Sequence, residues 1–267
     1  MVLLAAVALT ISGCSQPSTK IDVPVAQMLR GRTMGTTYVV KFMTTADGPS
    51  SEEVEKAVNS VLESVNAQMS TYIASSEISR FNTSQSTDWF AVSSETAEVA
   101  QLAKDIHSQT SGAFDITVAP LVDLWGFGPS RNQAGPPSES RIEELLERSS
   151  DQLEIRLSPP ALRKQSPQLR IDMSAIAKGH GVDRIAEKLN ELGVSSYFVE
   201  VGGEIRAAGS KEQGTPWRAG IERPLEDGRD LMTAVDLADD ALATSGNYRN
   251  FYLHKGAKYW HTIDPRT

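Results

Sequence analysis

An acid, a lysine and two glycines lie within one short stretch of the sequence, and together they are suited to holding a phosphate ester. Asp172 ends a strand-like run, and Lys178, Gly179 and Gly181 follow in the expected first turns of a helix. A helix N-terminus attracts anions, and glycines let phosphates approach the backbone. The lysine adds a mobile charge suited to a diphosphate. The stretch matches neither the P-loop nor the dinucleotide fingerprint, so a solvated lysine with packing glycines is an equal alternative.

A histidine close to the last residue is a candidate general base. His261 lies on a strand-like run and is followed by Asp264, Pro265 and Arg266. An imidazole titrates near neutral pH, so it could take a hydroxyl proton while the arginine holds an anion. A partly buried histidine beside a proline turn is locally the commoner arrangement.

Two further acidic residues give weaker signals. Asp115 follows Gly112 at the expected end of a helix, where a turn or cap carboxylate accounts for it equally well. Asp240 and Thr244 are four residues apart and could offer oxygens to a hard cation, although a polar turn is the simpler interpretation.

Composition narrows the class of protein. The 267 residues carry a formal net charge of -8, with 40% hydrophobic and 22% charged residues, which is ordinary for a globular domain. No cluster of Lys and Arg suggests a nucleic-acid-binding face, so a small-molecule or protein substrate is favoured. Cys14 is the one cysteine and the four histidines are scattered, which leaves neither an intramolecular disulfide nor a zinc cluster of Cys and His.

The first residues predict export and lipidation. Residues 2–11 form an apolar run of signal-peptide length, and residues 11–14 resemble a lipobox that would carry a lipid on Cys14. A buried strand with an inert cysteine is the alternative. We expect residues 1–14 to be a lipoprotein signal peptide, residues 15–28 a flexible tether, and residues 29–267 the catalytic domain. The expected location is the periplasmic side of the inner membrane.

The elements that must position these residues follow from hydrophobic periodicity. Ser50 and Glu53 form a capping box before the first helix, and Ser140 with Glu143 suggests a cap on a shorter helix. Helices followed by a strand-rich second half predict an α+β fold. The expected helices are 52–69, 94–109, a short one after 140, and 175–193; the expected strands are 31–43, 197–201, 217–221, 232–237 and a hairpin around 254–257; the expected loops are 131–138 and 158–168.

The order of the motifs resembles the ApbE family, the FAD:protein FMN transferases. The matching elements are the lipobox, R-T-M-G-T-T-Y, S-T-Y-I with E-I-S-R-F-N, G-A-F-D-I-T with L-W-G-F-G, I-D-M-S-A-I-A-K-G-H-G-V-D-R, V-E-V-G-G-E-I, A-T-S-G-N-Y and H-T-I-D-P-R-T. The resemblance implies a two-lobed α+β domain with FAD in the cleft between lobes. It also implies Mg2+ at the diphosphate, transfer of FMN to a Thr or Ser hydroxyl of a target flavoprotein, and release of AMP.

The resemblance also implies a role for individual residues. His261 would be the catalytic base, and Ala175 would offer its backbone carbonyl to Mg2+. Family members hold the metal with an Asp-x-x-x-Thr motif that follows the histidine segment, so those side-chain ligands are expected beyond Thr267 in a domain that is incomplete at its C-terminus. The implied FAD contacts are Met34, Tyr72, Ala113, Phe114, Asp115, Asp172, Lys178 and Ile263.

Two other functions remain open from the sequence. With water as the acceptor, the same site would be an FAD pyrophosphatase that yields FMN and AMP. A flavin-binding lipoprotein without catalysis would bind FAD tightly and release no AMP.

Overall fold

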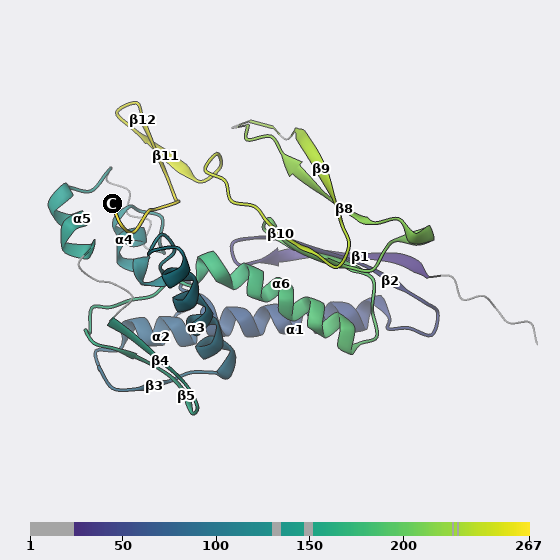
Figure 1. Ribbon diagram of the computed structural model, residues 1–267, viewed down its shortest axis with the longest axis horizontal. Coiled ribbons are helices and arrows are strands. Elements are labelled where there is room, and N and C mark those ends of the chain that lie inside the picture. The colour runs from purple at the N-terminus through teal and green to yellow at the C-terminus, as the bar shows by residue number, and fades with distance from the viewer. Residues whose placement is uncertain (1–23, 130–134, 147–151, 226, 229) are drawn as a thin grey trace, which may run out of the picture.

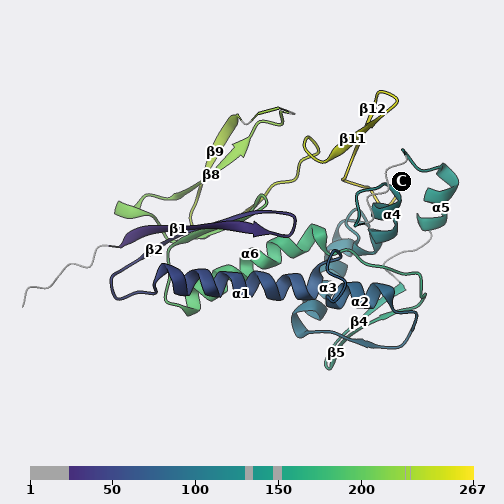
Figure 2. The same ribbon diagram turned by 180° about the vertical axis from the view of Figure 1, so that it is seen from behind.

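A five-stranded antiparallel sheet backed by two long helices forms the larger part of the fold. In the computed structural model, which describes residues 24–129, 135–146, 152–225, 227, 228 and 230–267, the strand order is β1-β2-β6-β7-β10. Helices α1 and α6 run side by side along one face of this sheet (Figures 1 and 2). The bounds are β1 (Val25–Thr33), β2 (Thr36–Thr44), α1 (Ser51–Met69), α6 (Ser174–Glu191), β6 (Tyr197–Val201), β7 (Glu204–Ala208) and β10 (Ala241–Ala243).

The sheet is a middle layer because its two faces bury different side chains. Tyr38, Val40 and Phe42 alternate along β2 toward the helices and pack with apolar residues of α1 and α6. Met43 and Phe198 point to the other face, where a hairpin of β8 (Trp217–Glu222) and β9 (Leu231–Leu237) covers them.

Helix α1 begins where the sequence predicts it. The side chain of Ser50 accepts a hydrogen bond from the backbone of Glu53, whose carboxylate accepts one from the Ser50 backbone in return. Such a capping box satisfies backbone groups that the first helical turn leaves without partners. The helix buries one stripe of apolar side chains: Val54, Val58, Leu62, Val65 and Met69.

A second region gathers at one end of α1 and α6 (Figure 1). It holds a second hydrophobic cluster, which includes Phe81, Leu162 and Ile171. A three-stranded sheet of order β3-β5-β4 closes it. The elements are α2 (Glu77–Thr83), β3 (Phe90–Ala91), α3 (Ser94–Gln109), η1 (Ile116–Val118), α4 (Ala119–Leu124), α5 (Glu139–Leu146), β4 (Leu153–Leu157) and β5 (Pro160–Lys164).

A last hairpin, β11 (Phe251–His254) with β12 (Ala257–Trp260), stands beside α4, where the chain also ends (Figure 1). The predicted hairpin is therefore confirmed, and so is the α+β class. Between the helical and sheet regions, α1 and α6 are shared, because each contributes residues to both hydrophobic clusters.

Several predicted boundaries are wrong. The single strand expected over 31–43 is two strands, because Met34 and Gly35 adopt positive φ values of 48° and 73° and form a two-residue hairpin turn. The loop expected over 158–168 contains β5, whose Lys164 is a buried charge that hides the strand pattern. Ser140 lies inside α5, which starts at Glu139, rather than at its cap.

Strand β1 begins at Val25, so it overlaps the tether expected over residues 15–28. Cys14 and the lipobox lie outside the described residues. Among the described residues, no helix combines the length and apolar character needed to cross a bilayer.

Candidate active site

The first turn of α6 is held in place by hydrogen bonds around Asp172. The backbone N–H of Asp172 donates to the carbonyl of Ile116 at 2.7 Å, which ties the segment before α6 to η1. The Asp172 carboxylate accepts from the Ser174 backbone N–H at 2.8 Å. Ala175 is exposed in the same turn, so this helix start is accessible and fixed, as an anion site requires.

Lys178 is oriented by an ion pair. Its ammonium donates to both carboxylate oxygens of Glu204, at 2.8 and 2.9 Å. Glu204 opens β7 directly after Gly202 and Gly203, which have φ values of 59° and 102° and turn the chain sharply. The Lys178 and Glu204 side chains are 30% and 17% exposed, so the pair sits at the edge of solvent, where an anionic ligand could reach the lysine.

A small cavity of about 90 Å³ lies next to Lys178. Met34, from the β1–β2 turn, and Tyr72, from the loop after α1, both line it. Tyr72 is 61% exposed. The cavity is smaller than a dinucleotide needs, so a dinucleotide bound here would extend beyond it. The remaining lining residues are Val65, Asn66, Met69, Ser70, Thr71, Ser174 and Ala177.

The Ala113–Asp115 segment directly precedes Ile116, whose carbonyl accepts the hydrogen bond from Asp172 before α6. The Asp115 carboxylate accepts from the backbone N–H and the hydroxyl of Thr117, both at 2.7 Å, and caps η1. His107 Nδ1 bonds to the carbonyl of Phe114 at 2.9 Å and lies 3.4 Å from the Asp115 carboxylate. Asp115 therefore has the cap role that the sequence suggested, on a segment adjacent to the anion site.

His261 follows β12 and reaches the same region from the C-terminal hairpin. Its backbone N–H donates to the carbonyl of Asn250 at 3.1 Å. Its ring packs edge-on against Phe127, with 6.5 Å between ring centroids. Burial lowers the pKa of His261, the backbone of Asn250 acts in the opposite direction, and the positive charge of Lys178 lowers it again. The net shift is downward, so the neutral imidazole is favoured near pH 7 and can accept a proton. Ile263, two residues on, is half-buried.

Asp240 and Thr244, the candidate cation ligands, do not form a metal site with each other. The Thr244 hydroxyl donates to the carbonyl of Gly203 at 3.1 Å, and the carbonyl of Asp240 accepts from Ala207. Within the described parts of the chain, no three or more His, Cys, Asp or Glu side chains cluster as metal ligands. A polar turn, the simpler interpretation, explains both residues.

Glu204 and Phe127 are the site residues that the sequence analysis missed. Glu204 had a signal, because its carboxylate follows a glycine pair that brings the strand close to α6. Phe127 had only the aromatic character of the L-W-G-F-G loop, which says nothing about contact with a histidine far along the chain.

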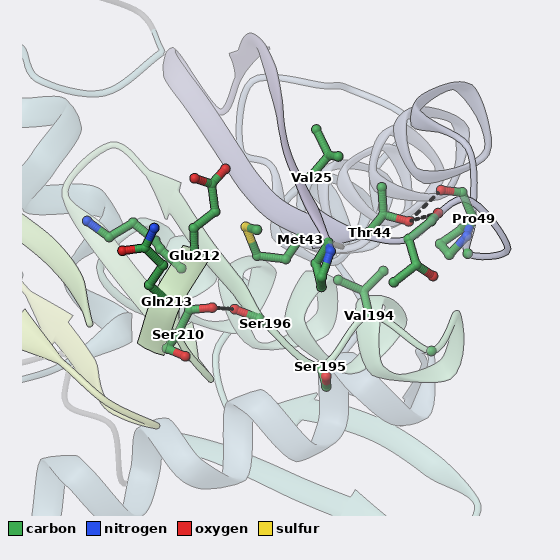
Figure 3. Close-up of a pocket in the computed structure, with 15 residues that line it drawn as sticks. Val25, Met43, Thr44, Pro49, Val194, Ser195, Ser196, Ser210, Glu212 and Gln213 are labelled. Atoms are coloured by element: carbon green, nitrogen blue, oxygen red, sulfur yellow. Dashed lines mark hydrogen bonds between the residues drawn. The ribbon is translucent and has the colours of Figure 1, made fainter. Parts of the chain in front are cut away.

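A larger cavity, of about 580 Å³, opens at the opposite end of the β1–β2 hairpin (Figure 3). Val25, Met43, Val194 and Ser196 line it, together with the loop after β7. It contains none of the residues singled out from the sequence, so the candidate active site is the smaller cavity beside Lys178 and not this larger one.

Comparison with known proteins identifies relatives along nearly the whole chain. The ApbE family model matches residues 34–267. The chain is 40% identical over 260 residues to an FAD:protein FMN transferase of Vibrio cholerae, covering 97% of this chain and 75% of that protein. It is 39% identical over 277 residues to one of Haemophilus influenzae, covering all of this chain and 77% of the relative.

Solved structures of flavin transferases superimpose on this chain. The flavin transferase ApbE from Vibrio cholerae superimposes with a TM-score of 0.81 and covers 91% of this chain and 77% of its own. The apo form of the Pseudomonas stutzeri flavinyl transferase ApbE has a TM-score of 0.80 at 33% identity, with 92% of this chain and 76% of that one covered. The chain belongs to the ApbE family.

Proposed function

We propose that this protein is an FAD:protein FMN transferase. The observation that carries the proposal is the chain of contacts between the start of α6 and the C-terminal hairpin. Arg170, two residues before Asp172, pairs with Asp123, and Phe127 of the loop after Asp123 packs on the ring of His261. The names of the relatives above support the donor and the group transferred. The acceptor is a Thr or Ser hydroxyl of a flavoprotein.

The residues divide the reaction between binding and proton transfer. Lys178 and the backbone at the start of α6 hold the diphosphate of FAD. Tyr72 and Met34 line the cavity beside Lys178 and contact the rest of the dinucleotide. His261 accepts the proton of the acceptor hydroxyl as its oxygen bonds to the FMN phosphorus. The bond from that phosphorus to the bridging oxygen breaks, and AMP leaves with the electron pair. Positioning and charge compensation supply most of the catalysis.

The described residues suit a magnesium ion that arrives with the substrate. They hold no cluster of three or more His, Cys, Asp or Glu side chains, and the Ala175 backbone carbonyl, at the exposed start of α6, is the oxygen we propose to meet the ion. Mg2+ is usually held by one or two protein oxygens, substrate phosphates and water. When bound, it would offset the negative charge that builds on the phosphates.

One experiment separates the three candidate functions. The protein is incubated with FAD and Mg2+, with and without an acceptor flavoprotein, and products are followed by intact mass and by nucleotide chromatography. A mass increase equal to FMN on the acceptor, matched by AMP and abolished by EDTA, is the expected result. FMN released without acceptor would make the protein a pyrophosphatase, and FAD binding without AMP would make it a binding protein.

We also propose that the mature protein is anchored by a lipid on Cys14 at the periplasmic face of the inner membrane. The apolar run before the cysteine and the polar segment after it support this. The expected mass of the protein extracted from membranes is that of a chain beginning at Cys14 with attached acyl groups. An unmodified N-terminus in the soluble fraction would contradict the proposal.

A further inference from the structure

Four aromatic rings join the C-terminal hairpin to the loop after α4. Tyr252 of β11 and Tyr259 of β12 stack with centroids 5.3 Å apart and planes at 19°. Trp125 packs on Tyr259 at 5.7 Å, and Phe127 packs on Tyr252 at 5.5 Å. We call these four residues the aromatic ladder. It fixes the hairpin that precedes His261 against the region that carries α4.

The ladder ends on the imidazole itself. Phe127 contacts the His261 ring edge-on, with centroids 6.5 Å apart and planes at 73°. Nδ1 of His261 is buried and has no hydrogen-bond partner among the described residues. A histidine that serves as a base usually has its ring held by a hydrogen bond from its other nitrogen. Here Nδ1 makes no such bond, and Phe127 packs on the ring beside it.

Phe127 is itself on a rigid support. Its backbone N–H and that of Gly128 both donate to the carbonyl of Val122, at 3.0 and 3.2 Å. Gly128 is required here, because an added Cβ would lie 1.8 Å from a carboxylate oxygen of Asp123. Asp123 in turn forms an ion pair with Arg170, two residues before Asp172. The loop that holds Phe127 is therefore tied to the segment that begins the anion site.

We propose that Phe127 is a positioning residue for His261: it orients the imidazole toward the acceptor hydroxyl and keeps water away from it. This inference rests on the proposed function, in which His261 takes the hydroxyl proton. Phe127 has no polar atom and takes no part in the chemistry, so its effect passes entirely through the histidine.

The electrostatic surroundings of His261 make the effect measurable. The positive charge of Lys178 on α6 lowers the pKa of His261, and the backbone of Asn250 raises it. Tyr252 and Tyr259 lie on the hairpin before His261, and burial raises the pKa of Tyr252. Asp264 is paired with Arg266 on its own segment. Burial and Lys178 lower the pKa of His261, so admitting water by removing the Phe127 ring raises this pKa toward 6.5.

The test compares Phe127→Leu with Phe90→Leu. Phe90 packs edge-on against Phe81 with centroids 5.8 Å apart and planes at 73°, so it makes a ring pair of the same geometry away from His261. Phe127→Tyr keeps the ring and serves as the rescue. For each variant, kcat and KM for FMN transfer are measured against pH, and the His261 pKa is measured by NMR.

We expect Phe127→Leu to lower kcat by about 10- to 100-fold with an FAD KM within about 2-fold, because a misplaced group slows the chemical step more than binding. The acid limb of kcat and the NMR pKa of His261 should both move to higher pH, and Phe127→Tyr should restore them. If Phe127→Leu and Phe90→Leu lower kcat equally, or if Phe127→Leu leaves the pKa of His261 unchanged, the inference is wrong. Wild-type protein that transfers no FMN refutes the proposed function instead, while the NMR titration still tests the packing.

Discussion

Replacing Lys178 with methionine should weaken FAD binding more than any other single change in α6. The lysine ammonium already makes two charged hydrogen bonds to Glu204, at 2.8 and 2.9 Å, so it is held where a diphosphate would meet it. A hydrogen bond to a charged group contributes about 1.5–3 kcal/mol, and each 1.4 kcal/mol is tenfold in affinity. The expected rise in the Kd for FAD is therefore about 10- to 100-fold.

A matched control lies in the same helix. Lys188 forms an ion pair with Glu191 at 2.7 Å on the exposed side of α6, so Lys188→Met removes the same side chain and a similar pair. Surface pairs of this kind contribute about 0–1 kcal/mol, and we expect no change in FAD affinity. Titration of both variants with FAD in the presence of Mg2+ makes the comparison.

Glu204 supplies a second check. In Lys178→Met its carboxylate, only 17% exposed, loses its partner and adds repulsion toward the diphosphate. The double variant Lys178→Met/Glu204→Gln should therefore bind FAD more tightly than Lys178→Met alone. If Lys178→Met and Lys188→Met have the same Kd, Lys178 does not contact the diphosphate and the proposed orientation of FAD is wrong.

Three further predictions follow from the site and the core. His261→Ala should keep FAD affinity but slow FMN transfer by about 10²- to 10⁴-fold. Because the pKa of His261 is lowered, mainly by burial, the midpoint of the acid limb of the wild-type transfer rate should lie below pH 6.5, and a midpoint above pH 6.5 contradicts the assignment of His261 as the base. Asp115→Ala should lower the free energy of unfolding by about 1 kcal/mol through the lost cap, whereas Asp115→Asn keeps the cap, so FAD titration of the asparagine variant isolates the charge. Lys164→Met should lower the free energy of unfolding by about 3 kcal/mol in urea melts, because the carbonyls of Phe81 and Pro167 lose a charged donor. Burial lowers the pKa of Lys164, so the folded state binds fewer protons than the unfolded state below pH 10.5. The free energy of unfolding of the wild type, relative to that of Lys164→Met, should therefore increase as the pH rises toward 10.5.

Local features of the fold were predictable from the sequence, and long-range ones were not. Helix α1 follows from its valine stripe and from the Ser50–Glu53 box, which depend on residues close together in the chain. The order β1-β2-β6-β7 depends on pairing between distant segments, which no local pattern encodes. The sequence did not predict strand β5, because a lysine is usually a surface residue. Lys164 is only 1% exposed, and its ammonium donates hydrogen bonds to backbone carbonyls.

The candidate site divides in the same way. The proposed anion site at the start of α6 could be predicted from Asp172, Lys178 and the nearby glycines, because the chemistry of a helix N-terminus is local. The partner of Lys178 was not, because Glu204 reaches it from another strand. The motif order named the family, and the structure then supplied the contacts that hold the motifs together.

Under the proposed function, those contacts would bring residues from distant segments to act on one phosphorus. Asp172 is bonded to Ile116, Arg170 is paired with Asp123, and the loop after Asp123 carries Phe127 onto His261. Each link joins rigid elements, so the distance from the diphosphate site to the base is set by packing and not by a flexible arm. The reaction needs little covalent chemistry from the protein, and its rate should therefore depend on this chain of contacts as much as on His261 itself. A substitution in the chain should then lower kcat while FAD affinity stays intact, the opposite of the result expected for Lys178.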